Sequence, residues 1–422
     1  MSGKVILRKK TVTAPPKYEA PPMDSVVVTC PGGAERVVAG EMARLGVLDL
    51  KQENGAVRGR SQERHIPVLN GELRSASRVL VPVMRVDAAG YDDVYEAARG
   101  IPWHLYLHPE DSFVIDGVSR SETLRDHRFL AMRLKDAIVD GQRAFFNGQR
   151  SSVSKEQPDL IVRITAIDGT VEIAIDSTGA PLHMRGYRTE AGEAPVRETV
   201  AAMMLLDAGF QRDDPRTLLD PFCGSGTIVI EAALISAGRG PGTLGRTFAW
   251  QRWPWIRSSE VSPAEQSRDR ARRSVRSRIV GTDSDPGMIE IARRNAARAG
   301  VEELVEFSVA DFRRSVSRFA GPGGAKGPKD PGSGKRGSQG LIVTNPPYGV
   351  RLQPEELSSL YSDLGTALRE ASGWTTIVLA AETAPVREIG LSPAARRRVF
   401  NGALPCRAYR YEIFDRRERD RR

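Results

Sequence analysis

Four residues, Asn345-Pro346-Pro347-Tyr348, combine a side-chain amide, a rigid backbone and an aromatic ring in one short segment. They follow directly after the apolar run Leu341-Ile342-Val343-Thr344, so we expect them to form the loop at the end of a buried strand. Two consecutive prolines make such a loop rigid. An amide, backbone carbonyls and a ring held in this way can grip a flat group that bears an amine. The same four residues are also compatible with a simple tight turn.

A glycine-containing loop and three acidic residues precede this segment, each at the expected end of an apolar strand. The loop from Asp220 to Thr227 opens a helix, and its two glycines let a ligand approach the backbone closely. It lacks the full spacing of a dinucleotide loop and the Gly-Lys-Ser/Thr of a phosphate-binding loop. Asp283 suits the paired hydroxyls of a ribose, and Asp311 can accept a hydrogen bond from an adenine amine, with Phe312 beside the ring. Each acid alone is more typical of a helix cap, but the series predicts a cofactor that bears a nucleoside.

These residues need elements that bring several strand ends together. From about Pro195 onward, helices alternate with short apolar strands, which is typical of a parallel sheet covered on both faces. Ligands of such open sheets bind at the carboxyl ends of the strands, so the pattern predicts a single site. The expected strands are Thr217 to Asp220, Ile279 to Asp283, Val305 to Val309, Leu341 to Thr344 and Thr375 to Ala380.

Two segments interrupt or end this alternation. Residues 321–340 contain eight glycines and three prolines together with several cations, and we expect a flexible basic insertion there. Near the C-terminus, Phe400 to Tyr411 carries turn signals at Asn401-Gly402 and Pro405, and Arg410 to Phe414 has the pattern of a strand. This predicts a terminal antiparallel hairpin.

The N-terminal half has a mixed pattern of helices and strands. A strand is expected at Ser25 to Cys30, followed by a helix, and residues 1–22, rich in Lys and Pro, are expected to be disordered. Two runs, Leu160 to Ile167 and Val171 to Ile175, flank Asp168-Gly169, which is a strong hairpin signal. These features predict an α+β region ahead of the α/β domain.

The composition favours a nucleic-acid partner. The chain has 422 residues, 40% of them hydrophobic, and carries 62 Lys and Arg against 53 Asp and Glu, a net charge of +9. Arginines gather in 268–278, 396–398 and 416–422, although each run alone is as typical of a solvated face. Three scattered cysteines fit a reducing compartment, so we expect a cytoplasmic protein without disulfides or a metal site. No apolar stretch has transmembrane length.

The acids and the asparagine loop resemble, in order and spacing, the motifs of the class I S-adenosylmethionine-dependent methyltransferases. Asp220 to Gly226 resembles their first motif, with Phe222 where many members have a further glycine, and the resemblance implies that Phe222 and Cys223 contact the cofactor. Asp283 and Asp311 match the next two motifs. Asn345 to Tyr348 resembles the signature of members that methylate an amine conjugated to a ring. The resemblance implies S-adenosylmethionine as the cofactor and a Rossmann-like domain with a seven-stranded, mostly parallel sheet.

Most of the chain, from about residue 25 to 415, resembles bacterial guanine-N2 methyltransferases of large-subunit ribosomal RNA, which carry a THUMP domain before the catalytic domain. The resemblance implies a ferredoxin-like part at 23–64, an RNA-binding THUMP domain at 65–177 and a catalytic domain at 178–422. It also implies that Pro195 and Glu198 help to close the cofactor site. The matching stretches are 134–140, 182–188, 194–199 and 401–406.

Three residues between these domains, Arg185, Tyr187 and Arg188, are candidate contacts to the RNA. They fit packing between the domains equally well. Some relatives carry a second methyltransferase after the first, and because this chain ends without one, we do not expect a second activity.

The resulting prediction is an RNA methyltransferase that forms N2-methylguanosine, with large-subunit ribosomal RNA as its substrate. A transfer RNA methyltransferase of the same architecture is the first alternative, and an RNA-binding protein with a degenerate methyltransferase fold is the second. DNA adenine and protein glutamine methyltransferases share the asparagine loop but have no need of the N-terminal domains. No membrane or metal partner is expected.

Overall fold

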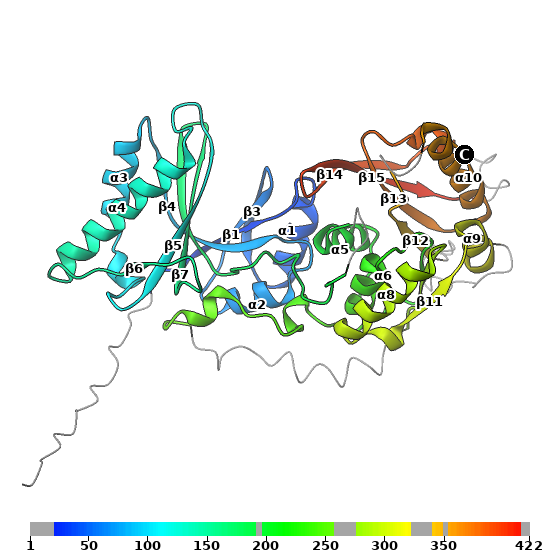
Figure 1. The fold of residues 1–422 in the computed structure, drawn as a ribbon, viewed down its shortest axis with the longest axis horizontal. Helices are drawn as coiled ribbons and strands as arrows, with labels where there is room; N and C mark the ends of the chain where they lie inside the picture. The colour runs from blue at the N-terminus through cyan, green and yellow to red at the C-terminus, as the bar shows by residue number, and fades with distance from the viewer. Residues whose placement is uncertain (1–20, 191–195, 257–275, 322–339, 349–352, 415–422) are drawn as a thin grey trace, which may run out of the picture.

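The chain forms two lobes, each built around its own sheet (Figure 1). The computed structural model describes residues 21–190, 196–256, 276–321, 340–348 and 353–414. Nearly all of the predicted N-terminal tail and of the predicted basic insertion lies outside these residues. Within them, one sheet has eight strands and belongs to the N-terminal lobe, and the other has seven and belongs to the C-terminal lobe.

The first half of the N-terminal lobe is a β-α-β-β-α-β unit with the strand order β2-β3-β1-β4, which is the ferredoxin-like arrangement. All of its strand pairs are antiparallel. The predicted domain boundary at 64/65 falls inside this unit, because α2 and β4 complete it. The elements are β1 (Ser25–Thr29), α1 (Glu35–Arg44), β2 (Leu48–Glu53), β3 (Ala56–Arg60), α2 (His65–Glu72) and β4 (Arg78–Asp87).

The same sheet continues from β4 into the order β8-β7-β5-β6, with the long strand β4 shared by both halves. Asp168 and Gly169 join β7 to β8 with φ values of 48° and 85°, as the type I′ turn of the predicted hairpin requires. Helices α3 and α4 pack against each other and against these strands. The elements are α3 (Tyr91–Arg99), η1 (Trp103–Leu105), β5 (Ser112–Arg120), α4 (His127–Phe145), β6 (Ser152–Val153), β7 (Leu160–Ile167) and β8 (Thr170–Asp176).

The C-terminal lobe has the strand order β11-β10-β9-β12-β13-β15-β14. The pairs from β11 to β13 are parallel, and β15 is antiparallel to both of its neighbours, so the predicted seven-stranded, mostly parallel sheet is confirmed. Its elements are α5 (Glu198–Asp207), β9 (Thr217–Asp220), α6 (Thr227–Ser236), η2 (Pro241–Thr243), η3 (Ala249–Arg252), β10 (Ile279–Asp283), α8 (Pro286–Ala299), η5 (Glu302–Leu304), β11 (Val305–Val309), α9 (Phe312–Ala320), β12 (Gly340–Thr344), α10 (Pro354–Glu370), β13 (Thr375–Ala381), η6 (Val386–Ile389), β14 (Ala395–Asn401) and β15 (Leu404–Glu412).

The terminal hairpin exists, but its bounds differ from the predicted ones. Its first strand, β14, begins at Ala395 rather than at Phe400, and the turn falls at Asn401-Gly402, where Gly402 has a φ of 70°. Pro405 lies inside β15 and not in a turn. The expected separate strand from Arg410 is the end of β15. The arginines at 396–398 therefore belong to a sheet strand, where side chains alternate between the two faces.

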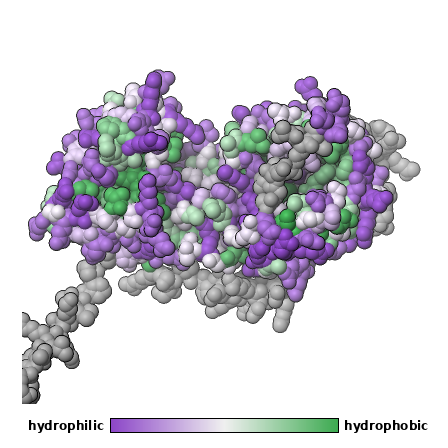
Figure 2. All heavy atoms as spheres, viewed as in Figure 1, coloured by the Kyte–Doolittle hydropathy of each residue, from purple (hydrophilic) through white to green (hydrophobic). Residues whose placement is uncertain are grey.

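The two lobes are tied together by residues that follow α6. The backbone N–H of Trp250 donates to the carbonyl of Ser177 over 3.0 Å, and Arg252 Nη1 donates to the carbonyl of Pro158 over 2.6 Å. Helix η2 packs on α2. Hydrophilic side chains cover most of the visible face of both lobes, with hydrophobic residues gathered in the middle of the N-terminal lobe (Figure 2). None of the described helices is long and apolar enough to cross a membrane.

Candidate functional site

A cavity of about 450 Å³ lies where β9, β10 and β12 end. The chain leaves the central strand β9 for β10 and β11 on one side and then returns to β12 on the other. Such a reversal of strand order opens a crevice between the loops, where ligands of α/β sheets bind. We call this space the catalytic cavity. The predicted site residues that line it are Asp220, Phe222, Cys223, Gly224, Asp283, Asp311, Phe312, Asn345, Pro346, Pro347 and Tyr348.

The two glycines of the loop after β9 have different roles. Gly224 lines the cavity with a φ of 50°, in the left-handed region, and its N–H donates to Asp283 Oδ2 over 2.9 Å. Gly226, with a φ of 86°, does not line the cavity in the described residues. A Cβ on Gly226 would approach the Ala292 Cβ to 3.1 Å, so this glycine lets α6 pack closely against α8. Only Gly224 is therefore placed to meet a ligand directly.

Asp220 connects the glycine loop to the asparagine loop. Its Oδ1 accepts a hydrogen bond from Thr344 Oγ1 over 2.7 Å and from the backbone N–H of Phe222 over 3.1 Å. The carboxyl group is buried, and loss of hydration raises its pKa to about 7. Because Thr344 immediately precedes Asn345, this contact sets the position of the asparagine relative to the glycine loop.

The other two acids have unequal roles. Asp283 ends β10, and its carboxylate accepts hydrogen bonds from the backbone N–H groups of Gly224 and Asp285. Asp311 does not end a strand as predicted, because β11 stops at Val309. It is the N-cap of α9 and accepts from the N–H of Arg313 over 2.8 Å. The helix-cap interpretation is thus correct for Asp311, although its side chain still lines the cavity.

Two aromatic rings form one wall of the cavity. Phe222 and Phe312 stack with their centroids 4.8 Å apart and an interplanar angle of 29°. Phe222 lies in the loop after β9 and Phe312 is the first residue of α9, which follows β11, so the two rings meet across the end of β10. A planar ligand can extend this stack.

The asparagine loop presents a buried acceptor without a donor. The Asn345 Oδ1 is inaccessible to solvent and has no hydrogen-bond partner among the described residues. A buried carbonyl oxygen left in this state costs about 1–3 kcal/mol, so a ligand that supplies an N–H is favoured there. Pro346, next in the chain, is buried, while Pro347 and Tyr348 are half-buried.

The charges around the cavity are mainly negative. Among the described lining residues, the carboxylates of Asp283, Asp285 and Asp311, together with Asp220, whose pKa is raised to about 7, stand against the guanidinium of Arg313. A positively charged ligand is therefore favoured over an anionic one. The described residues contain no group of three or more side chains able to hold a metal ion.

Arg185 and Tyr187 are not surface residues, which corrects their assignment as RNA contacts. Both are buried, and both meet Glu231 of α6: Arg185 Nε lies 3.2 Å and Tyr187 Oη 3.1 Å from Glu231 Oε1. Arg185 also donates to the carbonyls of Leu182 and Arg74, the latter in the ferredoxin-like unit. The alternative interpretation, packing between the domains, is therefore correct for these two residues.

Arg188 and Glu198 form an ion pair beside the cavity. Arg188 Nη2 lies 3.1 Å from Glu198 Oε2, and Nη1 donates to the carbonyl of Val196, which itself lines the cavity. Burial raises the pKa of Glu198 to about 7 despite the neighbouring guanidinium. Neither side chain lines the cavity in the described residues. Pro195 lies outside the described residues.

Several lining residues were not predicted from the sequence. Leu360 of α10 and Met288 of α8 come from helices that pack against the strands, and nothing in their local sequence marks them. Asp285 follows Asp283 closely and is the N-cap of α8, so its neighbourhood was a usable signal. Ser225 and Thr227 lie inside the predicted loop.

Comparison with family models assigns all three parts of the chain. A model described as an RMKL-like methyltransferase domain matches residues 185–320 and 329–410. A THUMP domain model matches residues 88–176, and a model described as the RlmL ferredoxin-like domain matches residues 25–80. The boundary between the two N-terminal models agrees with the complete β-α-β-β-α-β unit.

Similar proteins cover nearly the whole chain. A protein named ribosomal RNA large subunit methyltransferase K/L from Psychromonas ingrahamii is 34% identical over 89% of this chain and 48% of its own length. The chain thus spans about half the length of the K/L relatives it matches. A putative RNA methyltransferase, slr0064, from Synechocystis is 32% identical over 90% of this chain and 95% of its own length.

A solved structure has the same arrangement. The crystal structure of SMU.472, a putative methyltransferase complexed with SAH, matches with a TM-score of 0.77 and 28% identity, over 93% of this chain and 99% of that one. SAH is the form of S-adenosylmethionine that has lost its methyl group. Because a methyltransferase family model matches half of the chain and the Synechocystis relative is matched over 95% of its length, the chain belongs to the RMKL-like methyltransferases, which use S-adenosylmethionine.

Proposed function

We propose that this protein transfers a methyl group from S-adenosylmethionine to the N2 amine of a guanine in large-subunit ribosomal RNA. The observation that carries the proposal is the buried, unpartnered Asn345 Oδ1 at the edge of the catalytic cavity. This oxygen would be stabilised by an N–H donor, at the place where the methyl acceptor would lie. The exocyclic amine of guanine has two N–H bonds to offer.

The catalytic cavity fits the cofactor in charge and shape. When bound, S-adenosylmethionine supplies a methyl group on a positively charged sulfur, and the carboxylates of the lining favour such a cation. Gly224 leaves its side of the cavity free, since a Cβ built there would meet no atom within 4 Å. Asp283 would accept from the ribose hydroxyls. The Phe222 and Phe312 rings would contact the adenine, with Asp311 beside its amine.

The asparagine loop orients the acceptor amine. That nitrogen is a poor nucleophile because its lone pair is delocalised into the ring. Asn345 Oδ1 and the Pro346 carbonyl would each accept one N–H, which turns the lone pair out of the ring plane, and Tyr348 would stack on the base for about 1–3 kcal/mol. Orientation of this kind can supply about 7–11 kcal/mol of a transfer barrier.

No side chain is needed as a general base. The carboxyl group nearest to the asparagine loop, Asp220, is held by Thr344 and by the N–H of Phe222, so its role is to position the loops. The methylated amine is initially a cation and loses its proton to solvent. The rate enhancement then comes from the residues that hold the base and not from proton transfer.

RNA as the substrate is supported by the domains around the site. A THUMP domain precedes the catalytic domain, the net charge is +9, and the relatives described above are named as RNA methyltransferases. Ribosomal RNA is favoured over transfer RNA by the K/L names, and guanine over adenine by the resemblance of the whole chain. The four residues of the asparagine loop would serve either base.

The test is methyl transfer by the purified chain with isotope-labelled S-adenosylmethionine. Deproteinised ribosomal RNA, intact large subunits and bulk transfer RNA would be compared as acceptors, and the nucleosides would be identified by mass spectrometry. We expect label in N2-methylguanosine from ribosomal RNA.

Each other outcome removes a defined part of the proposal. Label in N6-methyladenosine would contradict the base, and label in transfer RNA alone would contradict the substrate class. Absence of transfer to every RNA, with cofactor binding intact, would contradict the function as a whole.

A further inference from the structure

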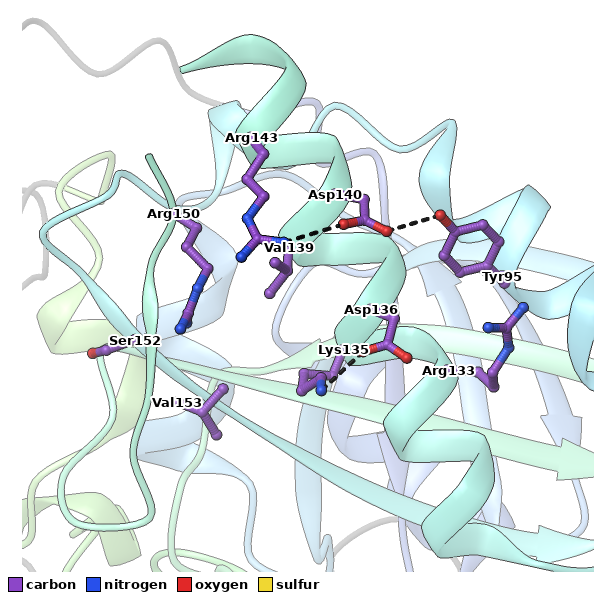
Figure 3. Close-up of a pocket in the computed structure, with 10 residues that line it drawn as sticks. All are labelled: Tyr95, Arg133, Lys135, Asp136, Val139, Asp140, Arg143, Arg150, Ser152 and Val153. Carbon is purple, nitrogen blue, oxygen red and sulfur yellow. Dashed lines mark hydrogen bonds and ion pairs between the residues drawn. The ribbon is translucent and has the colours of Figure 1, made fainter. Parts of the chain in front are cut away.

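A second cavity, of about 680 Å³, lies in the N-terminal lobe on the exposed side of α4 (Figure 3). Its walls come from α3, from α4, from the segment before β6 and from β6 itself. We call this space the arginine cleft. It is lined by Tyr95, Arg133, Lys135, Asp136, Val139, Asp140, Arg143, Arg150, Ser152 and Val153. The stretch 134–140 contributes its polar residues to the cleft and buries Leu134, Ala137 and Ile138 on the opposite side of the helix.

Two arginines from different elements point into the same part of the cleft. Arg143, near the end of α4, and Arg150, in the segment before β6, extend their guanidinium groups into the space between these elements (Figure 3). Arg143 lies 3.7 Å from Asp140 and is more than half exposed. Arg150 donates to the carbonyl of Ser151 and has no ion pair with a described carboxylate. Two converging cations repel each other, and an anion between them relieves this repulsion.

The other cations of the cleft are already neutralised. Arg133 pairs with Asp92 over 2.6 Å and covers the ring of Tyr95 at 4.5 Å. Lys135 lies 2.8 Å from Asp136. Arg150 has no ion pair with a described carboxylate, and the ion pair of Arg143 with Asp140 is the longest in the cleft at 3.7 Å, so these two cations are the ones most available to an anionic ligand.

Polar and apolar groups lie beside these two arginines. The hydroxyl of Tyr95 donates to Asp140 over 2.9 Å, which fixes that carboxylate on the floor of the cleft. Asp140, Asp136 and the Ser152 hydroxyl can accept hydrogen bonds from base amines or ribose hydroxyls. Val153, which is about half exposed, offers apolar surface to a ring. A ligand that matches these groups has a phosphate, hydrogen-bond donors and an apolar ring face, and a nucleotide has all three.

We propose that the arginine cleft binds an unpaired stretch of the RNA substrate, with its backbone phosphate between Arg143 and Arg150. The proposal rests on the proposed function for the identity of the ligand. The volume is that of a small-molecule pocket, within the usual range of about 300–1,000 Å³, and holds a few nucleotides but not a double helix. The phosphate contacts of Arg143 and Arg150 would fix the position of the RNA and would carry no sequence information.

The experiment measures binding of the full chain to a short unstructured RNA oligonucleotide by fluorescence anisotropy, without the cofactor. The test variant is Arg143→Glu/Arg150→Glu. The matched control is Arg120→Glu/Arg128→Glu, which makes the same charge change at exposed positions at the far end of β5 and the first turn of α4. We expect the test variant to bind at least about tenfold more weakly, and the control to bind nearly as the parent does. The slope of log K against log salt should fall by about 0.7–1.4 for the test variant.

Three results would overturn the inference. The first is equal loss of affinity in the test and control variants, which would mean that only net charge matters. The second is binding of an RNA duplex with the same dependence on Arg143 and Arg150. The third is competition by poly-glutamate as strong as that by the oligonucleotide, which would mark a general polyanion site.

The readout separates this inference from the proposed function. The parent protein could transfer no methyl group to any RNA while its oligonucleotide binding depends on the two arginines. In that case the proposed function is wrong and the inference about the arginine cleft is supported. If methyl transfer to RNA is found and the test variant binds as the parent does, the cleft fails and the proposed function stands.

Discussion

The catalytic cavity and the arginine cleft are built in opposite ways. The first is shaped by backbone turns after parallel strands, and its lining carries four acidic side chains against one cation among the described residues. The second lies on the outer side of α4, is shaped by side chains, and carries four cations against two carboxylates. The charges suit a cationic cofactor in one and a phosphate backbone in the other. If both proposals hold, the anionic substrate is anchored in the N-terminal lobe, apart from the proposed site of the methyl donor in the C-terminal lobe.

The difference also predicts how each site responds to substitution. The catalytic cavity depends on buried contacts behind its walls, so changes there affect stability or abolish transfer. The arginine cleft consists of exposed side chains, so changes there affect affinity in graded steps. The following substitutions test this contrast.

The largest effect is expected for Glu231→Ala. Glu231 is fully buried on α6, the helix that follows the glycine loop, and it accepts from Arg185 and Tyr187. Its removal leaves the Arg185 guanidinium buried without a carboxylate, which costs about 3–5 kcal/mol of the free energy of unfolding. Urea unfolding measures this loss. Arg143→Glu/Arg150→Glu should stay within about 0.5 kcal/mol of the parent, and equal losses in both variants would break the contrast.

Next in size is Asn345→Ala. Without the Oδ1 acceptor the amine loses its orientation, and we expect transfer to fall at least about 100-fold, as for the loss of one catalytic hydrogen-bond partner. Binding of S-adenosylmethionine, measured by calorimetry, should be nearly unchanged because Asn345 faces the acceptor. A variant with full activity would sink the proposed role of the asparagine loop.

A smaller effect is expected for Asp283→Ala. This change removes the acceptor for the Gly224 N–H and the proposed acceptor for the ribose. Loss of one hydrogen bond to a charged group is worth about 1.5–3 kcal/mol, so the cofactor should bind about tenfold more weakly or worse. Asp136→Ala in the arginine cleft is the control and should leave cofactor affinity unchanged. Equal cofactor affinity in both variants would remove Asp283 from the binding site.

The smallest test concerns pH. Burial raises the pKa of Asp220 from 3.8 to about 7, so the folded state holds this proton more tightly than the unfolded chain does. Its contribution to stability is complete below pH about 4 and is lost as the pH rises through about 7. Asp220→Asn keeps an acceptor for Thr344 but cannot titrate. Between pH 4 and pH 8, the free energy of unfolding should fall less steeply in this variant than in the parent protein. Parallel curves of the free energy of unfolding against pH for the two proteins would contradict the raised pKa of Asp220.

Much of the fold was predictable because its strands are short, apolar and regularly spaced. β9, β10, β11 and β13 begin and end within one residue of the predictions. The β2–β3 hairpin was missed because β2 is exposed on most positions and shows no alternation, although Asn54-Gly55 is a strong turn signal. The bounds of the terminal hairpin were wrong because arginines in β14 mask its strand pattern.

Site residues placed by the strand that precedes them could be predicted, whereas those placed by a partner far along the chain could not. Asp220, Gly224, Asp283 and the asparagine loop were predicted to share a site because each follows a strand, and parallel strands end at one edge of the sheet. Arg185 and Tyr187 were assigned to the RNA because cations and aromatic rings look alike in a sequence, whether they face solvent or a buried carboxylate. Their partner, Glu231, lies 46 residues from Arg185.

From the sequence, the types and order of the strand-end residues predicted a nucleoside-bearing cofactor, and their resemblance to the class I methyltransferases identified that cofactor as a methyl donor. The tertiary structure alone decided which charged groups are free to act. In the folded chain, Glu231 accepts hydrogen bonds from Arg185 and Tyr187. Asp311 is the N-cap of α9, and Asn345 Oδ1 has no donor among the described residues. The tertiary structure also brought Arg143 and Arg150 together across one cleft. The physical reason is that burial and pairing set the state of a charge, and both depend on contacts between residues far apart in the chain.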